Sequence, residues 1–214
     1  MNNSYKLVMF DMDGTLLDGK SIFVFAEKKG FLDKLINEFK SQKEPYKKSL
    51  KIASFLKGVD YRELIDVVRT IPFQKNVKKI VKLIQEKNIK IALSTDSYQF
   101  IANDLKNRLK LDYAFANNLI IEKNIIAGKI IINNFKMERC IDNKIYSICK
   151  GKILEKLCIE LKIKPSEVIA VGDGTIDIGM LRKAGLGIAY KASENVQKNA
   201  DISSDRLDII EKYI

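Results

Sequence analysis

The sequence predicts an α/β protein: a Rossmann-like, doubly wound parallel sheet, a small helical cap inserted after the first strand, and a β-hairpin. Short runs rich in Ile, Val, Leu and Ala recur along the chain, and segments with helical periodicity lie between them. Strands that alternate with helices imply right-handed crossovers and hence a parallel sheet. Two interruptions of this alternation predict the cap and the hairpin.

Five apolar runs are the predicted strands. Each is short and ends on polar residues or glycine, as is typical of buried parallel strands. In chain order they are Lys6–Phe10, Ile89–Leu93, Val168–Val171, Leu186–Tyr190 and the brief Ala200–Ile202. Apolar stripes at helical spacing within residues 77–84, 100–109 and 153–161 predict the helices that separate them.

Two segments interrupt the alternation. Asn118–Glu122 and Ile125–Ile132 flank Lys123-Asn124 and predict a β-hairpin. Residues 19–75 contain no strand-like run, but apolar residues at helical spacing occur within 31–39 and 61–68. We therefore expect a core of residues 1–18 and 76–214, with residues 19–75 as a helical cap.

The charge balance and the absence of histidine limit the possible functions. The 214 residues carry a net charge of +11 and include no histidine. Imidazole bases and His-ligated zinc sites are therefore excluded, and carboxylates, lysines and hydroxyls remain for chemistry. The positive charge points to polyanions, which include nucleic acid, anionic lipid and phosphorylated metabolites. Residues 19–75 contribute 13 Lys and Arg against 7 Asp and Glu, either as a solvated helix face or as a feature that attracts an anionic substrate.

Several features predict a soluble cytoplasmic protein without membrane contact. The first apolar run is too short for a signal peptide, and charged residues interrupt every apolar stretch before it reaches the length of a membrane span. Cys140, Cys149 and Cys158 lack metal-type spacing and are predicted to be free, buried or half-buried thiols. The oligomeric state is left open.

Four polar clusters lie near the predicted carboxyl ends of strands, where ligands bind in such sheets. They are Asp11-Met-Asp-Gly-Thr15, Ser94-Thr95, Lys150 before the helix that leads to the third strand, and Gly172-Asp-Gly-Thr-Ile-Asp177. Each alone is also typical of turns and helix caps. Together they would place carboxylates, hydroxyls and one cation at one edge, a set that suits Mg²⁺ binding and phosphoryl transfer.

With these four clusters in this order, the chain resembles the haloacid dehalogenase-like hydrolases along its whole length, within them the phosphoserine-phosphatase-like group with a helical cap. The resemblance implies a Mg²⁺-dependent phosphatase that acts on a small phosphorylated metabolite through an aspartyl phosphate on Asp11. It implies Mg²⁺ ligands from the Asp11 and Asp173 carboxylates and from the main-chain carbonyl of Asp13. The Asp13 side chain is then free for general acid and base catalysis, which needs no histidine.

The resemblance also implies roles for the remaining polar residues. Ser94 and the Thr95 amide are expected to bind phosphate oxygens, and Lys150 to pair with both the phosphate and Asp11. Thr15 is expected to hold the Asp13 side chain in position. Asp177 is expected to act from behind the metal ligands by orienting Lys150 or the metal's waters.

The sequence departs from phosphoserine phosphatases where their substrate specificity lies. Lys20 stands where they carry an acidic residue for the substrate amino group, and Ala53 stands near their carboxylate-binding arginine. Thr95-Asp96 replaces a glycine pair, and Ile176 replaces a phosphate-binding asparagine. We therefore expect Lys20 to contact substrate and the substrate to be a phosphomonoester other than phosphoserine, with extra negative charge facing the basic cap.

Two alternatives remain open at this point. One is a phosphoserine phosphatase proper, despite Lys20. The other is a polyanion-binding protein with little or no turnover, which the charge of +11 and the missing asparagine would favour. Because the sequence carries no RNA-stacking or helix-turn-helix signature, nucleic acid is the less favoured partner.

Overall fold

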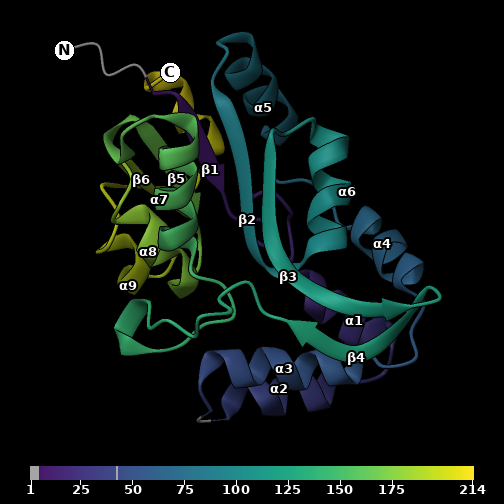
Figure 1. Ribbon diagram of the computed structural model, residues 1–214. Coiled ribbons are helices and arrows are strands. Elements are labelled where there is room, and N and C mark those ends of the chain that lie inside the picture. Colours follow the sequence, from purple (N-terminus) through teal and green to yellow (C-terminus); the bar gives the residue numbers. More distant parts are fainter. Residues whose placement is uncertain (1–4, 42) are drawn as a thin grey trace.

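The computed structural model describes residues 5–41 and 43–214 and confirms the predicted α/β class. A seven-stranded sheet in the order β4-β3-β2-β1-β5-β6-β7 forms its centre (Figure 1). Every neighbouring pair is parallel except β3 and β4. The strands are β1 (Leu7–Phe10), β2 (Lys90–Tyr98), β3 (Tyr113–Glu122), β4 (Ile125–Ile131), β5 (Val168–Gly172), β6 (Leu186–Tyr190) and β7 (Ile202–Ser204).

Helices cover both faces of the sheet because the strand residues alternate between two apolar clusters. Val8 and Phe10 of β1 face one cluster, which also takes the apolar stripes of α5 (Val77–Glu86) and α6 (Gln99–Leu109). Leu7 and Met9 face the other cluster, which includes residues of the following helices: α7 (Lys150–Leu161), α8 (Ile178–Leu181) and α9 (Glu194–Gln197). The sheet is therefore doubly wound, as the sequence predicts. Short 3₁₀ helices lie at Ile141–Asn143, Pro165–Glu167, Thr175–Asp177 and Leu207–Lys212.

Four helices lie between β1 and α5, where the sequence predicts a helical cap. They are α1 (Ser21–Lys28), α2 (Leu32–Lys40), α3 (Pro45–Phe55) and α4 (Tyr61–Thr70). Local sequence explains two of their starts: Pro45 occupies the first turn of α3, and the Asp60 side chain accepts a hydrogen bond from the Arg62 N–H at α4. The core and cap boundaries at residues 18/19 and 75/76 stay a prediction.

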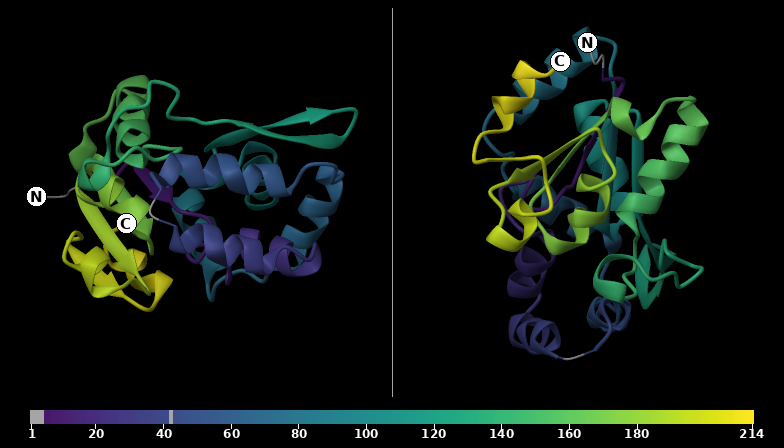
Figure 2. Two further views of the ribbon diagram at one scale, coloured as in Figure 1. Left: turned by 90° about the horizontal axis from the view of Figure 1, so that it is seen from below. Right: turned by 90° about the vertical axis from the view of Figure 1, so that its left-hand side faces the viewer.

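The predicted hairpin is a larger element than expected. β3 begins at Tyr113, and its first part pairs in parallel with β2, so only its second part forms the hairpin with β4. The loop between α3 and α4 continues this hydrogen bonding: Gly58 N–H donates to the Ile126 carbonyl, and Ile126 N–H to the Val59 carbonyl, both at 2.9 Å. In Figures 1 and 2 the hairpin extends from the sheet alongside the cap helices.

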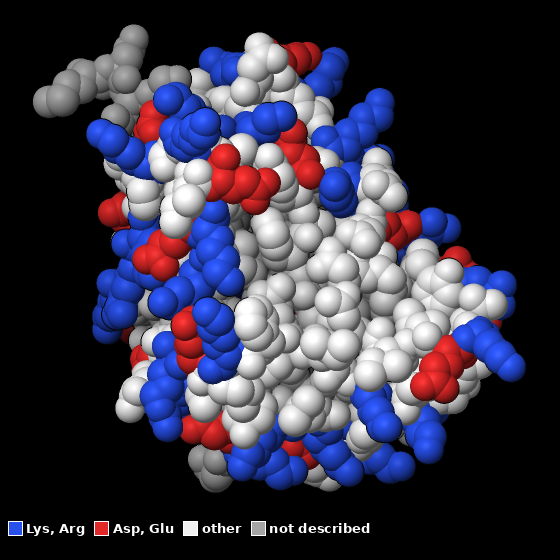
Figure 3. Space-filling model, viewed as in Figure 1, with Lys and Arg blue, Asp and Glu red and all other residues white. Residues whose placement is uncertain are grey.

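Charged side chains are unevenly distributed over the surface. In Figure 3, Lys and Arg gather along the left side and over the cap helices at the bottom, around a central uncharged area where Figure 1 shows β2 and β3. The three cysteines are free, with Cys158 buried and Cys140 and Cys149 half-buried, as predicted. Among the helices of residues 5–41 and 43–214, none is long and apolar enough to cross a membrane.

Candidate active site

The central strands bring the predicted clusters together. Phe10 at the end of β1 lies opposite Leu93 of β2 and Val171 of β5, so the residues that follow emerge at one edge of the sheet. Asp11 continues this arrangement, because its N–H donates to the Val171 carbonyl at 2.9 Å. Lys150, the first residue of α7, reaches the same place, because its ammonium donates to the Asp11 carboxylate.

Lys150 is buried between two carboxylates. Its ammonium donates to Asp11 Oδ1 and, at 2.5 Å, to Asp177 Oδ1. Burial opposes the charge of Lys150, but Asp11, Asp177 and Asp96 outweigh that effect and raise its pKa. The predicted contact between Lys150 and Asp11 is therefore present, and Lys150 is a fixed cation at the nucleophile candidate.

Asp177 has no free carboxylate oxygen. One oxygen accepts from Lys150, and the other accepts from the N–H groups of Asp173 at 3.1 Å and Gly174 at 2.8 Å. Burial and the charge of Asp11 raise the pKa of Asp177 to about 7, although Lys150 acts in the opposite direction. Asp177 thus positions both Lys150 and the loop that carries Asp173, in agreement with the predicted supporting role.

The Asp13 side chain is held by Ser21 and not by Thr15, so the predicted role of Thr15 is wrong. Asp13 accepts from the Ser21 N–H at 2.9 Å and from its hydroxyl at 2.8 Å. The turn after β1 directs Asp13 towards the start of α1, whereas the Thr15 hydroxyl donates to Asp173 Oδ1 at 3.0 Å. Burial and the charge of Asp11 raise the pKa of Asp13 to about 7, against the hydrogen bonds from Ser21. Asp13 can therefore hold or release a proton near neutrality.

The acidic groups form a set of hard oxygen donors. Carboxylate oxygens of Asp11, Asp173 and Asp177 lie within 4.8 Å of one another. Nearby, the Lys20 ammonium donates to the main-chain carbonyl of Asp13 and, at 2.7 Å, to Asp173 Oδ2. A cationic group thus already uses two of the three predicted metal-ligating residues, and oxygen donors of this kind suit Mg²⁺.

Close backbone approach in this set depends on Gly14. A Cβ atom at this position would lie 2.6 Å from Asp173 Oδ2, and its φ of +99° also favours glycine.

Ser94 and Thr95 lie within β2, because this strand continues to Tyr98 instead of ending at Leu93 as predicted. The Ser94 hydroxyl is buried and has no hydrogen-bond partner among the described residues. An unpaired buried hydroxyl is costly unless a ligand satisfies it, which suits a phosphate oxygen. The Thr95 hydroxyl differs, because it accepts a hydrogen bond from the Ser97 N–H at 3.1 Å.

Comparison with known proteins then settles the family. The family model described as haloacid dehalogenase-like hydrolase matches residues 5–185. The chain belongs to this family. It is 31% identical over 220 residues to "Phosphoserine phosphatase" of Methanocaldococcus jannaschii, which covers 100% of both chains. It is 29% identical to "Phosphoserine phosphatase" of Campylobacter jejuni subsp. doylei, over 96% of this chain and 97% of that one.

A solved structure supports the same assignment. The structure titled "Phospho-Aspartyl Intermediate Analogue of Phosphoserine phosphatase" superposes with a TM-score of 0.83 at 28% identity and covers 99% of both chains. As a haloacid dehalogenase-like hydrolase with this carboxylate and lysine site, the chain is a phosphoric monoester hydrolase that acts through an aspartyl phosphate. The predicted family and activity class are confirmed.

This haloacid dehalogenase-like hydrolase departs from phosphoserine phosphatases at Lys20 and Ile176. The structure shows what each of these side chains contacts. Lys20, predicted to contact substrate, faces Asp173 and the Asp13 carbonyl. The charges of Asp11 and Asp173 raise its pKa, although desolvation acts in the opposite direction. Ile176 is half-buried against the apolar cluster around α7, and its side chain has no group that could bind phosphate.

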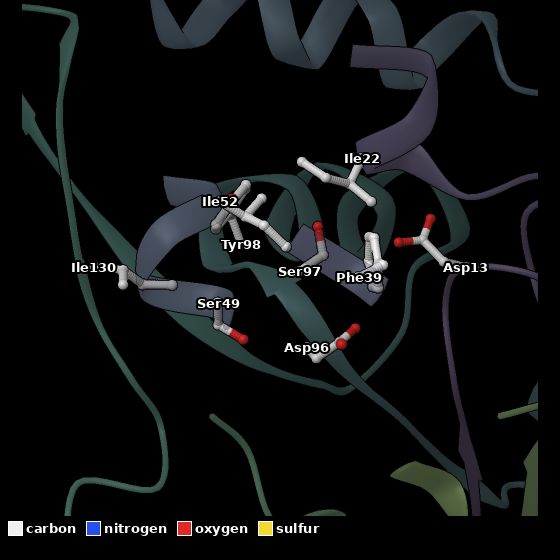
Figure 4. A pocket seen from close by; sticks show the side chains of 9 residues that line it. All are labelled: Asp13, Ile22, Phe39, Ser49, Ile52, Asp96, Ser97, Tyr98 and Ile130. Carbon is white, nitrogen blue, oxygen red and sulfur yellow. The ribbon is translucent and has the colours of Figure 1, made fainter. Parts of the chain in front are cut away.

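Between the hydrolase core and the cap lies a cavity of about 60 Å³ (Figure 4). Asp13 and Asp96 reach it from different sides, and both carboxylates point towards its interior. Asp96 is an exposed residue of β2, whereas Asp13 is buried. The cavity adjoins the proposed acid–base group, so it is the candidate place for the substrate's alcohol portion. Its lining residues are Asp13, Ile22, Phe39, Ser49, Ile52, Asp96, Ser97, Tyr98 and Ile130.

Sequence reasoning missed two residues that position this site. Ser21 holds Asp13, and its place at the start of a helix was the available signal. Gln74 is buried, donates to the Gly14 carbonyl at 3.1 Å, and accepts from the Tyr190 hydroxyl at 3.2 Å and the Lys191 ammonium at 2.8 Å. It thereby ties the loop after β1 to the end of β6, and no local sequence pattern indicated this.

Proposed function

We propose that the chain is a Mg²⁺-dependent phosphatase that hydrolyses a small phosphomonoester, with Asp11 as nucleophile and Asp13 as general acid and base. The observation that carries this proposal is the placement of two carboxylates with different environments. Asp11 pairs with the buried Lys150, while Asp13 is held by Ser21 with a pKa raised to about 7. Two neighbouring carboxyl groups with such different partners are typical of a nucleophile beside an acid–base group.

In the first step, an Asp11 carboxylate oxygen forms a bond to phosphorus as the bond from phosphorus to the alcohol oxygen breaks. Asp13 gives its proton to the leaving oxygen. In the second step, Asp13 takes a proton from water, the water oxygen bonds to phosphorus, and the Asp11–phosphorus bond breaks. Phosphate is released, and both carboxyl groups return to their starting states.

Cationic and hydrogen-bonding groups must offset the repulsion between a carboxylate and an anionic phosphate. Lys150 supplies a fixed positive charge at Asp11, and Ser94 offers its unpaired hydroxyl to a phosphate oxygen. The Thr95 amide is the second proposed phosphate donor. Asp11, Asp173 and the Asp13 carbonyl would hold Mg²⁺, which when bound supplies further charge neutralisation.

Phosphoserine, the substrate that the relatives' names state, fits this site poorly. Lys20 offers no acceptor where the resemblance would place one for an ammonium group, and Ala53 is fully buried in the cap and offers no donor to a carboxylate. An Arg-type fork for a carboxylate is therefore missing at the place where the resemblance would put it. We propose a different small phosphomonoester as the substrate.

A phosphate-release assay with Mg²⁺ tests the mechanism. We expect the protein to hydrolyse p-nitrophenyl phosphate, and Asp11→Asn to lower this rate by at least about a thousandfold, because the nucleophile is removed. The control is Asp66→Asn. It removes an exposed carboxylate on α4, which is distant in sequence from the residues at the sheet edge. Unchanged turnover in Asp11→Asn would refute the assigned nucleophile.

A further inference from the structure

We propose that the cavity between core and cap selects the phosphate ester of a small amino alcohol, with an ammonium group that binds Asp96 and with no carboxylate. This inference rests on the proposed function and concerns the alcohol portion of the substrate. It departs from both phosphoserine and the anionic substrate that the basic cap led us to expect.

The walls of the cavity are mainly apolar. Five of its nine lining residues are aliphatic or aromatic, and two more offer hydroxyls: Ser49 from the cap and Ser97 from β2. Its volume of about 60 Å³ lies well below the roughly 300–1,000 Å³ of pockets for drug-sized ligands. The cavity therefore favours a short organic group over a nucleoside or another large one.

Asp96 is the carboxylate in this cavity that has no partner. Asp13 already accepts two hydrogen bonds from Ser21, whereas the Asp96 carboxylate makes no ion pair or hydrogen bond with any residue in the described ranges. Its backbone is fixed on both sides: Asn117 donates to the Asp96 carbonyl at 2.7 Å, and Ser97 N–H donates to Thr95. Figure 4 shows the carboxylate directed into the cavity. Asp96 is exposed, so its carboxylate is open to solvent and free to pair with an ammonium group.

No cation lines the cavity among the described residues, so a substrate carboxylate would lack a partner. The two site lysines are committed elsewhere, with Lys150 on Asp11 and Asp177 and Lys20 on Asp173. Cap lysines such as Lys47 and Lys51 are exposed and do not line the cavity. The structure therefore does not support the expectation that extra negative charge on the substrate meets the basic cap.

Three esters separate these alternatives in one kinetic comparison with Mg²⁺. O-phosphoethanolamine carries the ammonium, propyl phosphate replaces it with a methyl group, and O-phosphoserine adds a carboxylate. We expect kcat/KM for O-phosphoethanolamine to exceed each of the others by about tenfold or more, since a charge-assisted hydrogen bond discriminates at about that level. We expect Asp96→Asn to reduce the ratio of O-phosphoethanolamine to propyl phosphate by about tenfold or more, and the control Asp66→Asn to leave it unchanged.

The outcomes distinguish this inference from the mechanism on which it rests. Equal kcat/KM for O-phosphoethanolamine and propyl phosphate, or a preference for O-phosphoserine, would overturn the amino-alcohol pocket and leave the phosphatase assignment intact. Failure to hydrolyse any ester, p-nitrophenyl phosphate included, would overturn both. The substrate series with the unaltered protein separates these outcomes even if Asp96→Asn does not fold.

Discussion

The Asp13 side chain is the proposed acid–base group in a chain without histidine. Its burial disfavours the charged form, and two hydrogen bonds from Ser21 fix its orientation without neutralising it. The result is a carboxyl group that titrates near neutral pH, where an imidazole ordinarily does. The absence of histidine from the sequence is therefore compatible with acid–base chemistry at this site.

The raised pKa of Asp13 predicts a pH-dependent gain in stability for Asp13→Asn. The unfolded chain releases this proton near the ordinary value of 3.8, whereas the folded chain keeps it until about pH 7. Stability is therefore lost as pH rises through this window, and asparagine avoids the loss: its Oδ1 can accept from the Ser21 N–H, and its NH2 group can donate to the Ser21 hydroxyl. At about 1.4 kcal/mol per pKa unit, we expect a gain of up to roughly 4 kcal/mol in the free energy of unfolding at pH 8 and almost none at pH 4.

Urea unfolding in the presence of EDTA, at both pH values, measures this gain. EDTA is needed because a bound cation would itself stabilise the Asp13 carboxylate. A gain of the same size at pH 4 and pH 8 would contradict the titration of Asp13 and would point to a packing effect.

The contacts of Lys20 predict that replacing this residue changes the affinity for Mg²⁺. Its ammonium contacts both Asp173 and the Asp13 carbonyl, so it would compete with Mg²⁺ for oxygen atoms that we propose as metal ligands. We expect Lys20→Met to tighten Mg²⁺ binding by about tenfold, because a like charge is removed from the site. Isothermal titration calorimetry without substrate measures the dissociation constant directly. Lys28→Met, which changes an exposed lysine at the opposite end of α1 from Lys20, is the control, and equal affinities in both variants would refute the competition.

The sequence predicted the residues that follow strand ends and one residue that supports them, Asp177, but it missed two others. Asp11 and Asp173 meet because parallel strands end at a common edge, a rule that sequence patterns already contain. Gln74 acts through contacts that depend on how the loops fold back, so no spacing in the sequence indicates it, whereas the available signal for Ser21 was its place at the start of a helix. Asp96 is visible in the sequence as a departure from the family pattern, but only the cavity shows where its carboxylate points.

The contact between the hairpin and the cap is the part of the fold that was least predictable from the sequence. Periodicity marked the hairpin strands, because their apolar residues are local in the chain. It could not indicate that β3 starts at Tyr113 or that the loop after α3 bonds to β4, since both features depend on partners distant in sequence. The hairpin joins the sheet to the cap and thereby helps to form the cavity, to which it contributes Ile130.

Gly128 tests this contact. Its φ is +76°, and a Cβ atom there would lie 2.8 Å from Cβ of Lys57 on the cap. Gly30 offers a matched control, with a φ of +72° and open space around the same atom. We expect Gly30→Ala to cost about 1 kcal/mol in the free energy of unfolding through its backbone alone, and Gly128→Ala about 2 to 3 kcal/mol because the strands must also shift.

Urea unfolding gives the two free energies, and hydrogen exchange locates the change. The Ile126 N–H, which donates to the Val59 carbonyl, should exchange faster in Gly128→Ala than in Gly30→Ala. Equal costs and equal exchange rates would mean that the hairpin and the cap do not support each other.

Over the whole molecule, we interpret the net charge of +11 as a source of long-range electrostatic attraction and not of direct contacts with the substrate. More than half of it falls on residues 19–75, yet none of the described lysines there lines the cavity, and Lys20, which lies at the site, pairs with Asp173. This arrangement disfavours a direct role in substrate recognition. It is compatible with attraction of an anionic ester towards the cleft, which is a long-range effect.

A triple variant distinguishes long-range attraction by the cap lysines from direct contact between these lysines and the substrate. Lys40, Lys47 and Lys51 are exposed residues of α2 and α3 that do not line the cavity. We expect their joint change to Gln to lower kcat/KM at low salt by about two- to fivefold for propyl phosphate and by less for O-phosphoethanolamine, because the ammonium group of the latter cancels one unit of the negative charge on which the field acts. Both losses should disappear near 0.5 M salt, where screening acts within about 4 to 5 Å. A change in the ratio of the two substrates that persists at 0.5 M salt would instead show that these lysines reach the cavity, and the cap charge would then determine specificity after all.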